Sequence, residues 1–323
     1  MQLPMLVHAT RQAARAGVLV SFSGSEEAVR YAFMLPTATA VATSCQLAGI
    51  GGAALFSPIF LLLFPLLGPE YPLASPSAAI ASALLTEVFG FSSGLSGYAR
   101  RGLVDWKVAQ QFLLISIPLA LAGALAAGAV AADPTALRLV YATLMLSLSA
   151  YLTFAPAAAD IAEEECQVPG DEIRTRVAAD GREFVYSALP KGDVQGGTAT
   201  AGGAFLTGLL GVGVGEVVLP QLVKTCCMPL SLAAGTSVAV VVATAAVAAV
   251  VQFLALAQTT GGDVASVIPW NLVQWTIPGV LLGGQIAPFL AARGTFSDEQ
   301  IERFAAILFA VVGVAFAAKA LEG

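Results

Sequence analysis

Two acidic side chains lie inside otherwise apolar stretches of the sequence and could carry chemistry. Glu216 lies within GLLGVGVGEVVLP (208–220), and Glu87 lies within ALLTEVFGF (83–91). An ionised carboxylate in hydrocarbon costs several kcal/mol, so such a group usually faces a cavity or carries a proton. We therefore predict that Glu216 and Glu87 couple proton movement to another solute. The alternative is that each carboxyl group only hydrogen-bonds a neighbouring helix.

Glycine-rich stretches followed by a proline occur twice, at LAGIGGAALFSP (47–58) and LLGVGVGEVVLP (209–220). Both predict discontinuous helices, which are tolerated at membrane depth only where they line a cavity or are buried in protein. The N–H groups at the start of such a helix, together with its dipole, can bind an anion without any arginine. The predicted anion-binding residues are Gly49, Gly51, Gly52, Ser77, Gly211, Gly213, Gly215, Thr236 and Ser237, and the predicted helix-breaking residues are Pro58 and Pro220.

Glycine also permits close helix packing, and this is the competing explanation for both stretches. It is the preferred explanation for GVLLG (279–283). A small-residue face such as Gly279 to Gly283 would also allow a homodimer to form.

The composition predicts a membrane protein that crosses the bilayer many times. Of 323 residues, 57% are apolar and 11% are charged, whereas soluble domains carry about 25% charged residues. The formal net charge of -6 argues against a nucleic-acid partner. We expect the partners to be a small anionic substrate and the lipid bilayer, and the location to be the cell membrane.

Each membrane helix needs about 20 apolar residues. Apolar segments predict spans at 32–67, 76–98, 108–130, 136–155, 199–223, 231–257, 267–290 and 302–321. The first is too long for one crossing and is interrupted at GIGG (49–52), so it predicts two pieces or a re-entrant helix. The expected fold is an all-α membrane protein with eight to ten transmembrane helices.

A polar, acidic segment at 156–197 divides the chain and contains EFVYSAL, which suggests a short strand or helix. The expected organisation is an interfacial segment at 1–30, a first transmembrane repeat at 31–155, this connector at 156–197 and a second repeat at 198–323. ASPSAA (74–79) corresponds to AGTSVA (234–239), which aligns Ser77 with Ser237. Further matches in the same order favour a duplicated unit: IPLALAG (117–123) with IPGVLLG (277–283), and DPTALRLVYATLM (133–145) with DEQIERFAAILF (298–309).

Positive charges suggest that the two halves are inverted. In the first half they lie in YARRGLVDWK (98–107), whereas the equivalent loop of the second half, TTGGDVAS (259–266), has none. There they lie in the flanking connections, at Lys224, Arg293 and Arg303. The positive-inside rule then predicts an inverted repeat. Four spans per half would not invert the second copy, so the number of crossings must be odd somewhere. The overlong segment 32–67 is the place for the additional crossing.

Enzyme-like strings lack the partners that catalysis would need. GFSSG (90–94) and GLSG (94–97) would need a histidine base, and the only histidine is His8. GVGVG (211–215) has no strand–helix context for a dinucleotide, and no phosphate-binding loop motif is present. The four cysteines lack metal-ligand spacing and are expected to be apolar filler. We expect no enzymatic activity, no cofactor and no metal.

The chain resembles the sulfite exporter (TauE/SafE) family of membrane permeases. The resemblance rests on AGIGGAALFSP (48–58), GYARRGLVDW (97–106), GLLGVGVGEVVLP (208–220) and PLSLAAGTS (229–237), and it covers roughly residues 40–155 and 200–321. The family pattern matches Gly49, Gly51, Gly52, Pro58, Gly211, Gly213, Gly215, Pro220, Thr236 and Ser237. Glu216 stands where many members carry glycine or another small residue.

The resemblance implies transport of sulfite or organosulfonates without a bound cofactor. Two alternatives remain open at this point. One is a permease for another small solute, such as thiosulfate, a carboxylate or a proton-linked cation. The other is a non-transporting scaffold or receptor that uses the 156–197 connector to bind a partner.

Overall fold

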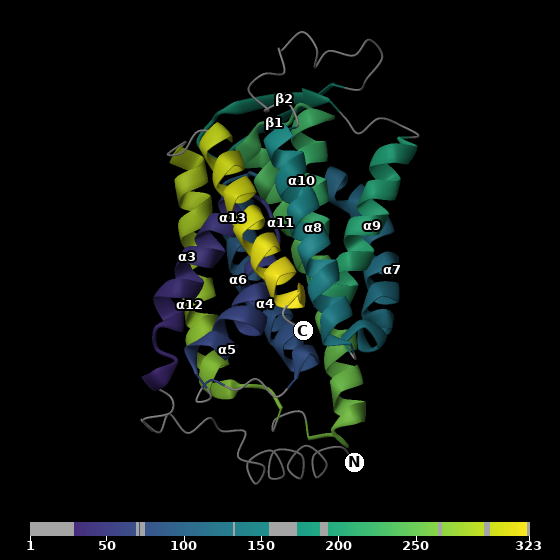
Figure 1. Cartoon of the computed structure of the whole chain (residues 1–323). Coiled ribbons are helices and arrows are strands. Elements are labelled where there is room, and N and C mark those ends of the chain that lie inside the picture. The colour runs from purple at the N-terminus through teal and green to yellow at the C-terminus, as the bar shows by residue number, and fades with distance from the viewer. Residues whose placement is uncertain are drawn as a thin grey trace, which may run out of the picture.

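The computed structural model describes residues 29–68, 71, 75–131, 133–154, 173–187, 193–263, 267–293 and 298–321. This part of the chain is a bundle of helices that run between two ends, with a small two-stranded sheet over one end (Figure 1). The predicted helical membrane architecture is confirmed, whereas the interfacial segment expected at 1–30 lies almost wholly outside the described residues.

The elements in chain order are α3 (Met34–Leu47), α4 (Ala53–Pro58), the π-helical turn η1 (Ile59–Leu63), α5 (Phe64–Leu67), α6 (Pro76–Arg100), α7 (Trp106–Ala131), α8 (Pro134–Phe154), β1 (Ile173–Val177), β2 (Glu183–Ser187), α9 (Val194–Leu210), α10 (Val214–Lys224), α11 (Leu230–Thr259), α12 (Trp270–Arg293) and α13 (Asp298–Leu321). Polar side chains cap the starts of several helices, α6 and α9 among them. Ser75 Oγ accepts a hydrogen bond from Ala78 N at α6, and Asp193 Oδ1 accepts one from Gly196 N at α9.

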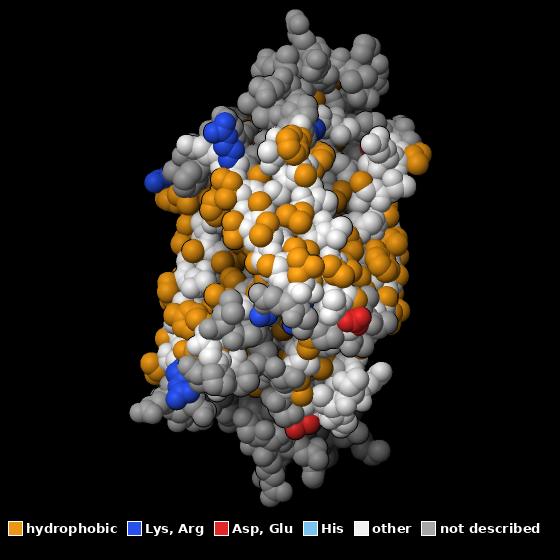
Figure 2. Space-filling view, in the orientation of Figure 1, with side chains coloured by type: hydrophobic (Ala, Val, Ile, Leu, Met, Phe, Trp, Pro, Cys, Tyr) orange, Lys and Arg blue, Asp and Glu red, His pale blue; other side chains and the backbone are white. Residues whose placement is uncertain are grey.

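Among the described residues, four helices (α6, α7, α11 and α12) are long and apolar enough to cross a membrane, and α8 and α13 contain shorter apolar stretches. Apolar side chains predominate on the flanks of α8, α12 and α13, while charged side chains lie toward the ends of these helices (Figure 2). Large side chains such as Leu114, Leu125 and Ile307 point outward, with exposed fractions of 79%, 72% and 65%. An apolar flank of this kind suits contact with lipid.

The overlong first segment folds back on itself as a helical hairpin. α3 ends at Leu47 and α4 begins at Ala53, and the run α4–η1–α5 then returns beside α3. Phe64 shows the reversal, because its ring centroid lies 5.9 Å from that of Tyr31 and 6.2 Å from that of Phe33, at the start of α3. The hairpin opens toward the end opposite the sheet (Figure 1). We call residues 48–52, at its turn, the first tip.

The stretch 199–223 is also a helical hairpin, so the prediction of one span there is wrong. α10 runs back along α9, where Gln221 Nε2 donates to Thr200 Oγ1 at 3.1 Å. Gly211 and Gly213, at the reversal, have φ values of +85° and +141°, which L side chains rarely adopt. A Cβ at Gly203 would lie 2.7 Å from the Gly213 carbonyl oxygen, so the two helices need glycine to approach this closely. We call residues 211–216 the second tip.

The predicted helix-breaking role of Pro58 and Pro220 is also wrong, because both lie inside helices, α4 and α10. A proline removes only one backbone N–H and crowds the preceding turn. The chain absorbs this at Pro58 with the π-helical turn η1 that follows. The reversals are made at the tips instead.

Close helix contacts inside the chain use the small-residue faces. α12 packs against α3, where a Cβ at Gly279 would lie 2.6 Å from the Leu35 carbonyl oxygen and one at Gly283 would lie 2.5 Å from that of Thr39. The Thr39 hydroxyl also donates to the Gly279 carbonyl at 3.0 Å. The packing explanation for GVLLG is therefore confirmed, and this face is not free to form the homodimer suggested by the sequence.

The described part of the connector forms an antiparallel pair of strands in which Arg176 faces Phe184. EFVYS is therefore a strand rather than a helix. Backbone hydrogen bonds join the pair to two helix connections: Ala179 N donates to Arg101 O, and Ser187 N donates to Cys226 O, each at 2.9 Å. The connector's sheet is thus docked on the helix bundle.

The described cysteines divide into two kinds, and Cys166 lies outside the described residues. Cys45 and Cys226 are buried thiols that are not disulfide-bonded, as expected of apolar filler. Cys227 is disulfide-bonded, so the expectation fails for that residue.

Candidate functional site

The two tips meet inside the bundle. Gly51 N, in the first tip, donates a hydrogen bond to Glu216 Oε1 at 3.2 Å. A Cβ at Gly215 would lie 2.9 Å from Gly51 N and 3.2 Å from Gly49 O. Gly49, Gly51 and Gly215 are all buried. Glycine at these positions therefore permits backbone from the two halves of the chain to touch.

Glu216 connects both tips through one carboxyl group. Besides Gly51 N, it accepts a hydrogen bond from Gly213 N at 3.0 Å on its other oxygen, Oε2. Glu216 is the third residue of α10, so its carboxylate lies at the positive end of that helix dipole. Only 4% of the residue is exposed. The converging N–H groups predicted to hold an anion are thus present, and a carboxylate of the chain itself occupies them.

Glu87 reaches the same point from the middle of α6. A Cβ placed on Gly51 would lie 2.9 Å from Glu87 Oε1 and 3.3 Å from Glu216 Oε1. Glu87 is 1% exposed, and neither of its carboxyl oxygens has a hydrogen-bond partner in the described part of the chain. The N–H groups of Gly52 and Ala53 approach the carboxyl group but do not complete hydrogen bonds of good geometry. The two predicted proton-coupling residues are therefore brought together.

The three hydroxyl residues that were predicted to bind the anion do not lie together in the structure. The Ser237 hydroxyl donates to Gly49 O at 2.8 Å and so helps to hold the first tip. Ser77 lies in the first turn of α6, ten residues before Glu87, which is about 15 Å along a helix axis. Counted from their helix starts, Ser82 rather than Ser77 occupies the position of Thr236, and Ala83 that of Ser237.

The remaining predicted glycines belong to the tips. A Cβ added to Gly52 would lie 2.9 Å from the Phe91 ring, and one added to Gly211 would lie 3.2 Å from Ala53 Cβ. Thus Gly49, Gly51, Gly52, Gly211, Gly213 and Gly215 all line the region where the two hairpins meet.

Polar residues that sequence reasoning missed support the second tip. Val214 N donates to Thr207 Oγ1 at 2.8 Å, so Thr207 satisfies an N–H group in the first turn of α10. The Tyr141 hydroxyl donates to Leu210 O at 2.5 Å, and Gln252 Nε2 donates to Gly208 O at 2.7 Å. Their position inside apolar segments is the signal that could have drawn attention to them.

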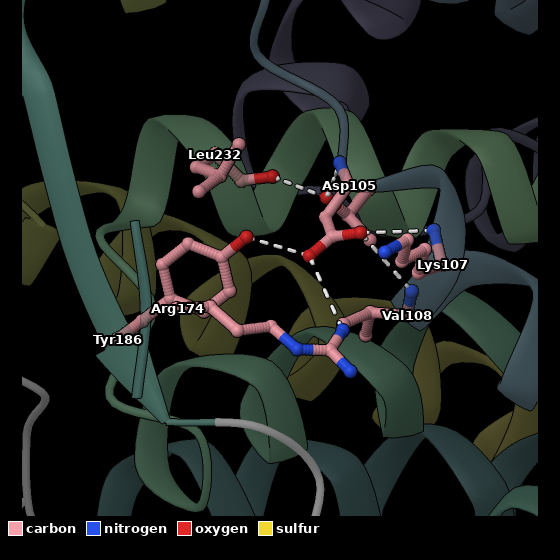
Figure 3. Close-up of polar contacts among 7 residues, drawn as sticks. Asp105, Lys107, Val108, Arg174, Tyr186 and Leu232 are labelled. Atoms are coloured by element: carbon pink, nitrogen blue, oxygen red, sulfur yellow. Dashed lines mark hydrogen bonds and ion pairs between the residues drawn. The ribbon is translucent and has the colours of Figure 1, made fainter. Parts of the chain in front are cut away.

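A second polar cluster surrounds Asp105, beside Tyr186 and Arg174 of the connector's strands (Figure 3), and Thr236 belongs to it through a hydrogen bond to Asp105. Asp105 Oδ1 accepts hydrogen bonds from Lys107 N at 2.9 Å and Val108 N at 3.2 Å, which caps the start of α7. Its Oδ2 accepts the Tyr186 hydroxyl at 2.5 Å and lies 3.7 Å from the Arg174 guanidinium. Thr236 Oγ1 accepts a hydrogen bond from Asp105 N at 3.0 Å.

This second cluster is structural in character. Burial, and then the hydrogen bond to Asp105, raises the pKa of Tyr186 above its usual value, so the phenol remains a donor to the carboxylate. The cluster thereby fastens β1 and β2 to the starts of α7 and α11. Within the described residues, no group of His, Cys, Asp and Glu side chains has the arrangement of a metal site.

Comparison with known proteins gives a family. The family model described as "Sulfite exporter TauE/SafE" matches residues 33–316. No match was found among curated proteins or among solved structures. The matched region contains both tips, both buried glutamates and the connector. The chain therefore belongs to the sulfite exporter TauE/SafE family, a family of membrane permeases.

Proposed function

We propose that this protein is a secondary permease for a small sulfur-containing anion, such as sulfite or an organosulfonate, in the cell membrane. The observation that carries the proposal is the convergence of Gly51 N–H and Gly213 N–H on one carboxylate. N–H groups arranged to bind a carboxylate also suit a sulfite or sulfonate group, because each presents negatively charged oxygens to the donors. The family supplies the sulfur chemistry.

The packing of the helices supports an inverted repeat, and with it alternating access. α3 packs on α12 as α9 packs on α7, and α6 packs on α12 as α11 packs on α7. When α4, η1 and α5 are counted as one helix, α3–α8 and α9–α13 are two units of five helices, in which α3 corresponds to α9, α6 to α11 and α7 to α12. Exchanging the two units therefore turns each contact of a pair into the other contact of that pair. The two hairpins open toward opposite ends (Figure 1). Repeats of this kind place the substrate at their interface and move around it.

The neighbouring carboxyl groups support coupling to protons. Glu87 and Glu216 both lie against Gly51, out of contact with water. Two carboxylates so close together in a dry site repel each other, and a proton on one of them relieves that repulsion. We propose that the pair exchanges a proton with the aqueous side to which the site is open during transport.

The test is anion flux in proteoliposomes. We expect labelled sulfite to exchange only when the protein is present and to respond to an imposed pH gradient. Gly215→Ala should abolish exchange because its methyl group would push the tips apart. Gly128→Ala is the matched control, since a Cβ there would contact nothing within 4 Å.

Two results would change the substrate or the function. Exchange of thiosulfate or a carboxylate in place of sulfite would keep the permease and replace its substrate. The absence of exchange for every anion, from protein that remains folded in the vesicles, would remove the proposed function.

A further inference from the structure

The N–H groups of the two tips cannot hold both Glu216 and a substrate anion. Gly51 N and Gly213 N each donate to Glu216, one to each carboxyl oxygen. A backbone N–H has one proton to donate. An anion that binds to these two donors must therefore displace the Glu216 carboxylate.

The hydrogen bonds distinguish the two buried glutamates. Glu216 accepts two hydrogen bonds and lies at a helix N-terminus, both of which favour its ionised form. Glu87 is 1% exposed, and the N–H groups of Gly52 and Ala53 approach its carboxyl group without completing a hydrogen bond, although it points at the same place. The charge of the pair therefore belongs on Glu216, and the proton of the pair belongs on Glu87.

The other titratable groups around the pair do not supply a compensating positive charge. The titratable side chains beside the pair include the Cys45 thiol of α3 and the Tyr141 phenol of α8, and neither group can carry a positive charge. In the described part of the chain, no Lys or Arg forms an ion pair with Glu87 or Glu216. Adding a second negative charge to such a dry site would be costly.

We propose that Glu216 is an internal stand-in for the substrate, displaced from the tips by each entering anion and neutralised by one proton as it leaves them. The inference rests on the proposed function, because it requires that the transported anion bind at the tips. Two N–H···carboxylate hydrogen bonds are exchanged for two N–H···anion hydrogen bonds, and the displaced carboxylate gains a proton from water. For a monoanion, the charge of the site is the same before and after.

The pH dependence of anion binding tests this exchange. The probe is methanesulfonate, a monoanion that does not titrate near neutral pH, bound to the purified full chain in detergent and measured by calorimetry. Because one proton is taken up with each anion, the affinity should fall about tenfold for each unit of rising pH. Repeating the titration in buffers of different ionisation enthalpy counts the proton directly and needs no variant.

Two variants identify the residue that takes up the proton. Glu216→Gln removes the titrating group, so its methanesulfonate affinity should no longer change with pH. Glu87→Gln should keep the tenfold dependence, since a neutral amide resembles the protonated acid already present. Both amides preserve the size of the buried side chain.

Each outcome has a distinct meaning. Binding with no proton uptake by the wild type, or with an unchanged pH dependence in Glu216→Gln, would overturn the stand-in role and leave the permease proposal in place. Loss of the pH dependence in Glu87→Gln would overturn the assignment of the exchanging proton to Glu216. Failure of methanesulfonate, sulfite and thiosulfate to bind would remove the proposed function together with this inference.

Discussion

A methyl group at Gly51 would contact both buried carboxyl groups at once, which makes Gly51→Ala a direct probe of their placement. The added Cβ would lie 2.9 Å from Glu87 Oε1, well inside the 3.4 Å at which ordinary contact begins. The Glu87 carboxyl group must then retreat by about half an ångström. Such overpacking costs about 1–3 kcal/mol. The lower flexibility of alanine in the unfolded chain offsets about 0.4–1 kcal/mol of this, so we expect a net destabilisation of about 1–2 kcal/mol.

Gly51 does not have a positive φ, so alanine adds no backbone strain of the left-handed kind. The contact with Glu87 can therefore be isolated by a double-mutant cycle with Glu87→Ala. In the wild-type background, Gly51→Ala should lower the midpoint of thermal unfolding in detergent by a few degrees. In the Glu87→Ala background, the same change should cost little, because the clashing carboxyl group is gone. Gly128→Ala, on an open face of α7, serves as the control.

Additive effects of the two substitutions on the unfolding midpoint would contradict this placement of Glu87. If Gly51→Ala lowers the midpoint equally in both backgrounds, its methyl group does not meet Glu87. The two carboxyl groups would then not share the space beside the first tip, and the proton-coupling proposal would lose its geometric basis.

Three further predictions concern Ser237, Gly123 and Tyr186. Ser237→Ala should reduce anion exchange because the first tip loses its hydroxyl contact, while Ser77→Ala should leave exchange unchanged. An equal reduction of exchange by the two variants would contradict the placement of the site. Gly123→Ala should destabilise the bundle by about 1–3 kcal/mol, because its Cβ would overlap the α9 backbone. Gly128→Ala should not destabilise it, and thermal unfolding of the two variants measures the difference. Tyr186→Phe removes a hydrogen bond to a carboxylate worth about 1.5–3 kcal/mol, so amide exchange in the connector's strands should quicken at least about tenfold, and unchanged exchange would show that the phenol does not fasten the sheet. Because the folded-state pKa of Tyr186 is raised above its usual 10, its contribution should be complete below about pH 10 and should be lost as the pH rises through the raised pKa.

The sequence contains enough information to predict residues of the candidate site, but not the hairpins that carry them. Glycine and glutamate inside apolar segments are exceptional, and Gly51, Gly215 and Glu216 do meet in the structure. A hydropathy window cannot tell one long helix from two short ones that fold back, so 199–223 reads as one span. The reversal depends on the positive φ of Gly211 and Gly213. Glycine is also found in unbroken membrane helices, and its presence alone does not predict that conformation.

The misplaced hydroxyl groups have a different cause. Ser77 aligns with Ser237 only through short runs of small residues, which recur in any alanine-rich membrane segment. The helix starts show that the register differs, because Ser77 is the second residue of α6 and Ser237 the eighth of α11. Thr236 lies one residue from Ser237 but faces Asp105, since neighbouring residues on a helix point in different directions.

The docking of the connector could not be read from its composition. The segment is polar and acidic, and only EFVYS indicated regular structure. Its attachment depends on Asp105 and Tyr186, which are 81 residues apart in the sequence and meet only in the folded chain. A single sequence offers no local pattern that pairs two such residues.

Locating a bound anion would test the central claim most directly. The measurement is anomalous X-ray scattering from crystals of the full chain soaked with selenite, the heavier analogue of sulfite, at several concentrations. We predict one saturable peak within hydrogen-bond distance of Gly51 N and Gly213 N, with the Glu216 carboxyl group moved away from both. A saturable peak elsewhere, for example beside Arg174 under the connector's sheet, with the tips still closed on Glu216, would contradict it.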